Sequence, residues 1–198
     1  MELSPEQREG LNVALNEATL LGLEVDPSRR LAGATFSVLA LQETGVVPSD
    51  SRVQMLFVNV GRVAVSLFDE SSPAPVPVPI DRLLETVQSF NGGDVYGWEF
   101  VDVKDNPFQA SGSGKSLDLE FTDGSMAHSI NLFQGVKRKL DLCVWFEDLK
   151  VRTPDGIEID MRDFIAAGRR WWDAFHKHDP RTQGRGMFSM APKSDGHA

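Results

Sequence analysis

Few residues in this 198-residue sequence have the types and spacing that catalysis needs. Cys143 and His128 fall on two neighbouring segments that both have strand-like patterns, and a thiolate with an imidazole base can act as a nucleophile. Asp141 or Glu147 could then orient the imidazole. A buried free cysteine is more often a small apolar residue, so the sequence favours a structural Cys143. The enzymatic or small-molecule alternative predicts a pocket near Trp98, His128, Cys143, Trp145 and Glu147.

Two adjacent carboxylates, Glu147 and Asp148, stand where the alternation of a strand is interrupted. Bulges often re-aim side chains near functional sites, which makes this pair of interest. Adjacent residues on a strand point to opposite faces, however, and this argues against a shared acid/base role.

The run Gly112-Ser113-Gly114-Lys115-Ser116 resembles the end of a phosphate-binding loop. The first glycine of that motif should fall at Gln109, and a strand follows where a helix N-terminus is required. We therefore expect no nucleotide site here.

His176 and His178 could both bind a metal only if the chain is extended there, because within a helix they point some 200° apart. Asp179 is a third possible ligand, but nothing is spaced to complete a site. The sequence contains no GxSxG, HExxH, CxxC or dinucleotide motif. No metal and no cofactor is therefore expected.

The elements that would position these residues are clearest from 140 to 175. Alternating residues predict a strand over 140–146, and the change of parity at Glu147 predicts a bulge or a passage under a different layer. The run 153–156, Thr-Pro-Asp-Gly, predicts a turn into a short strand over 157–159. Asp160 is a strong N-cap for the helix that follows.

This C-terminal helix is amphipathic and is expected to lie on a sheet. Trp172 lies at the middle of its apolar arc and is predicted to be core, whereas Trp171 lies at the edge and is a candidate binding residue.

Ser4, Pro5 and Gln7 form a capping-box start for an N-terminal helix that is predicted to run to about Gly22. Val13 and Leu20 would lie nearly opposite its main apolar stripe. They indicate either contact with a second chain or a frayed last turn with one scattered exposed valine.

The remaining segments alternate between strand and helix patterns. Strands are expected over 30–41 and 95–103, hairpins over 53–68 and 117–133, the latter closed by Asp123-Gly124, and a middle helix over 80–90. The predicted fold class is α+β: a mainly antiparallel sheet of about six to eight strands built from hairpins, packed by an N-terminal helix, a middle helix and a C-terminal Trp-containing helix. Residues 1–178 form one predicted domain, and 179–198 a flexible or partner-ordered tail.

The composition excludes several classes of function. A net charge of −9 without clustered basic residues disfavours nucleic-acid binding. A single cysteine, the lack of a signal-peptide pattern and the lack of a membrane-length apolar run predict a cytoplasmic protein, bacterial in style.

The leading hypothesis is a non-enzymatic protein-binding module that acts through its sheet and helix surfaces. The order of helices and strands is loosely similar to that of small chaperones for secreted effectors, and the composition is comparable to that of small acidic bacterial immunity proteins. These likenesses imply an immunity-like, chaperone-like or adaptor role, with a protein partner and a possible homodimer.

Overall fold

A computed structural model describes residues 3–69, 74–90, 95–101, 114–122, 126–135 and 138–183, with backbone alone for 95–99 and 101. The fold is α+β with antiparallel strand pairing, as the sequence predicts. The helical elements are α1 (Pro5–Ala14), η1 (Ile80–Arg82), α2 (Leu83–Gln88), α4 (Met161–His176) and η3 (Pro180–Thr182). The strands are β1 (Thr19–Asp26), β2 (Leu31–Ser37), β3 (Arg52–Val58), β4 (Arg62–Asp69), β5 (Val95–Val101), β6 (Leu117–Glu120), β7 (His128–Gln134), β8 (Arg138–Phe146), β9 (Asp148–Arg152) and β10 (Glu158–Ile159).

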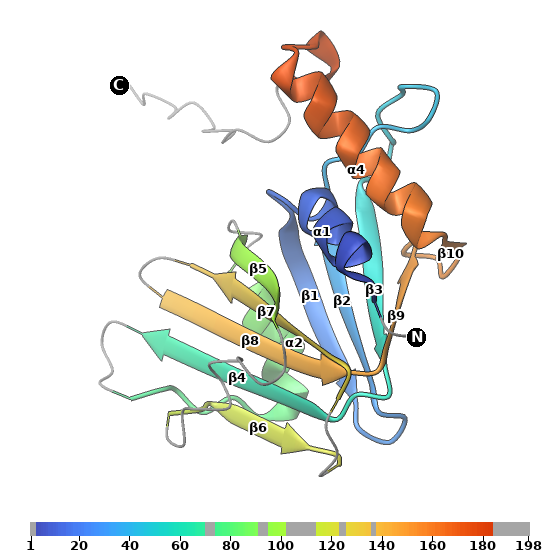
Figure 1. The fold of residues 1–198 in the computed structure, drawn as a ribbon. Helices are drawn as coiled ribbons and strands as arrows, with labels where there is room; N and C mark the ends of the chain where they lie inside the picture. The colour runs from blue at the N-terminus through green and yellow to red at the C-terminus, as the bar shows by residue number, and fades with distance from the viewer. Residues whose placement is uncertain are drawn as a thin grey trace, which may run out of the picture.

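The strands of the described chain lie in two five-stranded sheets rather than in one. Sheet A has the order β1-β2-β3-β9-β10, and sheet B has the order β5-β7-β8-β4-β6. Figure 1 shows the strands of the two sheets running in clearly different directions. Neither hairpin predicted over 53–68 and 117–133 is present, because β3 and β4 belong to different sheets and β6 pairs with β4, not with β7.

Two chain segments cross from one sheet to the other at a common corner. The first runs from β3 into β4 and the second from β8 into β9, and the two are hydrogen-bonded where they bend: Gly61 N donates to Trp145 O at 2.9 Å, and Glu147 N donates to Val58 O at 3.2 Å. The interrupted alternation at Glu147 therefore marks a passage into a different layer, which was one of the two predicted alternatives. Pairing was mispredicted because a bend of this kind leaves both flanking strands with ordinary local patterns.

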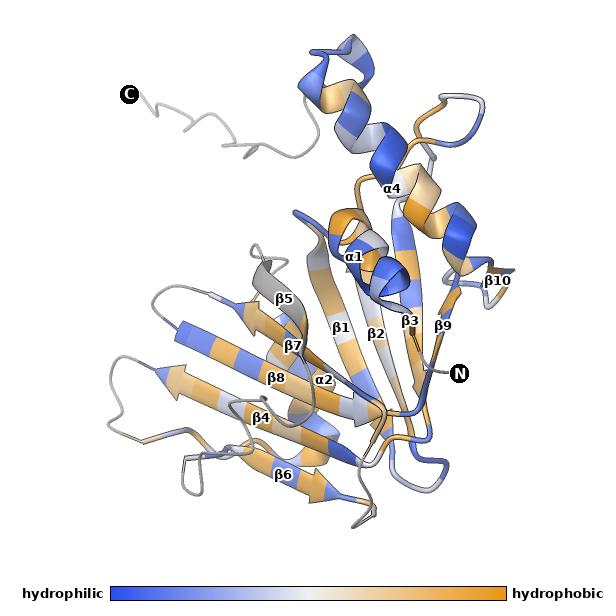
Figure 2. Ribbon diagram, in the orientation of Figure 1, coloured by the Kyte–Doolittle hydropathy of each residue, from blue (hydrophilic) through white to orange (hydrophobic). Residues whose placement is uncertain are grey.

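The largest apolar core cluster of the described residues joins the two sheets. It combines residues of both sheets with α1, α2 and α4, and its fully buried members include Leu11, Phe36, Phe57, Ile130 and Phe146. Hydrophilic and hydrophobic residues alternate along α4 and along β6 in Figure 2, as expected of elements with one polar and one apolar face.

The N-terminal helix is shorter than predicted. The capping box of Ser4 and Gln7 is present, but the helix ends at Ala14 and Glu17 adopts a left-handed φ of 59°. Leu20 belongs to β1 and is fully buried, while Val13 is half-buried on α1. The two residues therefore form no common helical face, because antiparallel pairing of β1 with β2 overrides the helical spacing of 15–22.

The C-terminal helix begins as predicted, with the Asp160 carboxylate accepting from Arg162 N. The turn over 153–156 and the short β10 are also present. The prediction for the tandem tryptophan was wrong: Trp171 is buried and Trp172 is half-buried. The reason is that α4 packs mainly against α1 and the segment after β2 instead of lying flat on a sheet, and Trp171 contacts Leu41 there.

The chain beyond α4 is held as far as Gln183. Asp179 caps η3, and Thr182 is buried within the region that the sequence assigns to the tail. Within the described residues no helix has both the length and the apolarity needed to cross a membrane.

Candidate functional site

The structure separates the predicted nucleophile from its base. His128 is paired with Phe146 across β7 and β8, and Cys143 is paired with Asn131, three residues further along each strand. Because directly opposed residues share a face and successive residues alternate, His128 lies with the core face of sheet B and Cys143 with the opposite face. A Cys143–His128 dyad is therefore not formed.

His128 has a structural role. Its ring is buried, its Nε2 accepts from Leu3 N at 3.0 Å, and a terminal nitrogen of Arg8 lies 3.1 Å from Nδ1. The imidazole thus fixes the N-terminal end of the described chain against sheet B through Nε2, which accepts from Leu3 N.

Cys143 and Trp145 do share a face of sheet B, in a small buried cluster with Ala64. The Arg62 guanidinium lies 4.9 Å from the centre of the Trp145 ring and binds both Asp118 oxygens at 2.8 Å. This bidentate hydrogen bond with Arg62 holds the pKa of Asp118 below its ordinary value. The group is a satisfied ion pair stacked on an aromatic ring, which is a structural arrangement.

The remaining candidates of the alternative pocket, Trp98 and Glu147, are described only in part. Trp98 pairs through its backbone with Leu132, and its side chain lies outside the described residues; Glu147 marks the corner between the sheets. Of the phosphate-loop-like run, residues 112 and 113 lie outside the description, and Lys115 is ion-paired to Asp118 just before strand β6.

The described residues contain no group of three His, Cys, Asp or Glu side chains arranged to hold a metal ion. His176 ends α4, and His178 follows with a left-handed φ of 56°.

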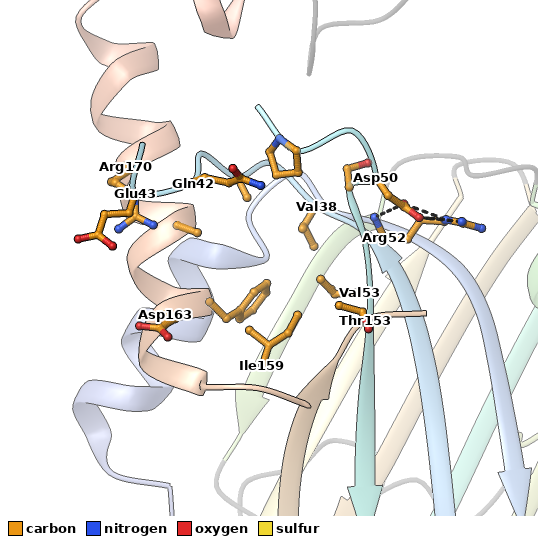
Figure 3. Close-up of a pocket in the computed structure, with 15 residues that line it drawn as sticks. Val38, Gln42, Glu43, Asp50, Arg52, Val53, Thr153, Ile159, Asp163 and Arg170 are labelled. Carbon is orange, nitrogen blue, oxygen red and sulfur yellow. Dashed lines mark hydrogen bonds and ion pairs between the residues drawn. The ribbon is translucent and has the colours of Figure 1, made fainter. Parts of the chain in front are cut away.

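A pocket of about 580 Å³ opens between α4 and the edge of sheet A, and we call it the α4 pocket. Figure 3 shows Val38, Val53 and Ile159 pointing into it from the sheet side, across from the residues of α4. The whole apolar floor consists of Val38, Ala40, Val53, Ile159, Phe164 and Ala167. A volume of this size accommodates one large side chain with its neighbours, and it lies within the range of ligand sites.

Charged side chains surround this floor. Asp50 and Arg52 form a bidentate pair on one side, with Nη2 to Oδ2 at 2.8 Å, and this hydrogen bond lowers the pKa of Asp50 to about 2. Glu43 and Asp163 are exposed, and among the described residues neither carboxylate has a hydrogen bond or ion pair. The charged groups that line the pocket are the carboxylates of Glu43, Asp50 and Asp163 and the guanidinium groups of Arg52 and Arg170. The rim therefore carries a net negative charge.

The rim loop, residues 41–48, is fixed to α4 by its first residue. Leu41 N donates to Ala167 O at 3.1 Å, and Arg170 Nε donates to Leu41 O at 3.0 Å. The middle of the loop is fixed to η3, since Arg181 Nη1 donates to Gly45 O at 2.8 Å. The pocket is thus a built feature whose rim is tied at two points.

Two exposed apolar residues lie close in sequence to residues that line the pocket. Val46, in the rim loop, is 56% exposed, and Ile157, in the turn that ends at β10, is 64% exposed. Val46 lies two residues before Pro48 in the sequence, and Ile157 lies two residues before Ile159. Pro48 and Ile159 both line the pocket. Exposed apolar residues beside a concave apolar floor are typical of an interaction surface.

A second pocket of about 590 Å³ lies on the other side of the β10–α4 junction. It is lined by Leu3, Gln7, the β9 residues 148–151 and the segment 158–162. Polar and apolar side chains contribute about equally to its lining, and its polar residues are exposed or half-exposed.

Sequence reasoning did not find the α4 pocket. Its lining comes from three distant segments, 38–53, 153–159 and 163–170, and no motif joins them. The sequence did contain one indication of this surface, namely an apolar residue in each of two polar turns. These residues are Val46 and Ile157. Comparisons with family models, with curated proteins and with solved structures give no match to this chain.

Proposed function

We propose that this protein is a non-enzymatic binding module that holds a segment of a partner protein in the α4 pocket. The observation that carries the proposal is an apolar floor beneath a rim with two carboxylates, Glu43 and Asp163, that have no partner among the described residues. An apolar side chain of the partner would fill the floor, and a neighbouring lysine or arginine would meet the rim.

The chemistry of the lining supports binding over catalysis. The described residues that line the pocket include no cysteine or histidine. The two hydroxyl residues among them have structural partners: Ser51 Oγ lies 3.0 Å from Ser37 Oγ, and Thr153 Oγ1 accepts from Ile157 N at 3.0 Å. Neither hydroxyl has a base that would activate it as a nucleophile.

The charge of the molecule supports a basic partner. The rim is net negative and the whole chain carries −9, so a cationic segment is attracted from a distance and an acidic one is repelled. An immunity-like, chaperone-like or adaptor role would each use such a surface, and the cytoplasmic location stays a prediction.

A peptide-display experiment tests the proposal. A random peptide library selected on the immobilised full chain should enrich sequences with a large apolar residue within about four positions of lysine or arginine. A synthetic peptide of the enriched sequence, labelled with fluorescein, should bind the full chain in an anisotropy titration, and more weakly as salt increases.

Variants locate the site. Two pocket variants should each lower the affinity for the peptide tenfold or more. One is Ala167→Trp, which fills the floor, and the other is the double variant Glu43→Lys with Asp163→Lys. A matched pair with the same change of charge, Glu9→Lys with Asp81→Lys, should weaken it far less, since both residues are exposed and outside the pocket. Binding that is unchanged by both pocket variants would place the site elsewhere and end the proposal.

A further inference from the structure

The chain returns to the α4 pocket after α4 has ended. Arg181, in η3, donates to Gly45 O in the rim loop, and the contact is close, because a Cβ built on Gly45 would lie 2.3 Å from the Arg181 Nη1 atom. Asp179 fixes Arg181 in turn through Nη2 to Oδ2 at 2.6 Å, and this hydrogen bond lowers the pKa of Asp179 to about 2. Residues beyond Gln183 therefore start from a point tied to the rim of the pocket.

The sequence that follows has the chemistry proposed for the partner. Residues 184–193 read Gly-Arg-Gly-Met-Phe-Ser-Met-Ala-Pro-Lys, with three large apolar residues between two cations and no acid. The apolar residues are Met187, Phe188 and Met190, and the cations are Arg185 and Lys193. In a chain with 29 acidic and 20 basic residues, a stretch of ten with two cations and no carboxylate is complementary to the rim.

The length of this segment is sufficient. Four residues lie between Gln183 and Phe188, and the five steps from one to the other give an extended reach of about 17 Å. The rim loop that Arg181 contacts also carries Gln42 and Glu43, which line the pocket. The contact of Arg181 with Gly45 starts the segment beside this loop, so the segment is long enough to come to the rim of the pocket.

We propose that residues 185–193 of the same chain occupy the α4 pocket, with Phe188 as the apolar anchor and the two cations beside Glu43 and Asp163. This inference rests on the proposed function and adds its regulation: the partner segment must displace the tail. The tail acts as a built-in competitor that keeps the apolar floor covered until a stronger basic ligand arrives.

Tethering makes a weak ligand effective. A short flexible linker gives an effective concentration of about 1 mM. If the free segment binds with a Kd of about 0.1 mM, the tethered segment fills the pocket about nine-tenths of the time and weakens a competing ligand about tenfold.

The experiment measures this competition in the full chain. The probe is a fluorescein-labelled synthetic peptide of residues 184–198, titrated by anisotropy into the wild-type chain and into the triple variant Met187→Ser, Phe188→Ser, Met190→Ser. The triple variant should bind the probe about tenfold more tightly, because its own tail no longer competes. A control variant, Ser194→Ala with His197→Ala, should bind like the wild type.

Each outcome decides the matter. Equal affinity for the two chains, or no binding to either, overturns tail docking, whereas the proposed function is judged separately by the peptides selected from the library. Light scattering covers the remaining case: a dimer that is present in the wild type and lost in the triple variant would mean that the tail docks into a second copy, which overturns docking within one chain.

Discussion

At the scale of single residues, the charged side chains on the outer face of sheet B differ in what the fold does to them. Asp118 is held by two hydrogen bonds from Arg62 and one from Lys115, at 2.7 to 2.8 Å. Asp141, on the same sheet, is partly buried, and burial raises its pKa above the ordinary value. The two aspartates should therefore respond to pH in opposite directions.

Substitution of Asp118 by asparagine should destabilise the fold at neutral pH. The pKa of Asp118 is lower in the folded state, so its contribution is present above the unfolded pKa near 3.8 and is lost as the pH falls through the folded value. Because the carboxylate is about a third exposed, we expect a loss of about 0.5–1 kcal/mol at pH 7 that is smaller at pH 3. Urea unfolding at both pH values measures it, with Asp155→Asn as the exposed control. A loss of equal size at pH 7 and pH 3 would contradict the electrostatic account.

Substitution of Asp141 by asparagine should have the opposite sign. A raised pKa means that the folded state resists ionisation, so the penalty is absent below the unfolded pKa, grows as the pH rises and is complete above the folded pKa. Asparagine carries no charge at any of these pH values. We expect the thermal midpoint at pH 7 to rise by about 1–2 °C, with little change at pH 3. A lowered midpoint at pH 7 would show that the ionised carboxylate is stabilising.

At the scale of helices and strands, the caps and turns could be predicted from the sequence, whereas the pairing of the strands could not. The Asp160 N-cap, the Ser4 capping box and the turn before β10 each depend on residues within four positions of one another. Leu20 shows the limit: its spacing fits a helix, but its place is set by Phe36, its partner on β2. The α4 pocket could not be predicted for the same reason, since its lining is assembled from three distant segments.

The contact between α1 and α4 depends on two glycines. A Cβ at Gly168 would lie 2.6 Å from the Ala14 Cα, and a Cβ at Gly10 would lie 2.6 Å from Ile165 Cγ2. The first obstacle is backbone, so Gly168→Ala should cost about 1–3 kcal/mol, although alanine is favoured over glycine by about 1 kcal/mol in an open helix.

Denaturant unfolding measures the cost, and Gly33→Ala is the control. A Cβ at Gly33 would meet only the end of the flexible Gln54 side chain, at 3.1 Å, so a small effect is expected there. A Gly168→Ala variant as stable as the wild type would mean that the two helices do not approach this closely.

At the scale of the whole molecule, the two sheets behave as parts of one unit in two respects. The bent segments 52–69 and 138–152 each contribute a strand to both sheets, and one core cluster draws on residues from both. Loss of β3, β4, β8 or β9 from its sheet would therefore disturb a segment that the other sheet needs. This connection also fixes the α4 pocket, because Val53 of β3 and Ile159 of β10 reach it from sheet A.

A core substitution in sheet B should therefore loosen sheet A to the same extent. Val65→Ala removes two methyl groups from a fully buried position on β4 and should cost about 1–3 kcal/mol. Native-state hydrogen exchange then reports on each sheet separately. The most protected amides of β2 and β3 should lose the same free energy of protection as those of β7 and β8, because both exchange through global unfolding. Thr86→Ala, outside both sheets, controls for nonspecific effects. Protection that falls in β7 and β8 while β2 and β3 keep theirs would show that the sheets unfold independently, and the corner at Gly61 and Glu147 would then be a hinge between two units instead of a bend within one.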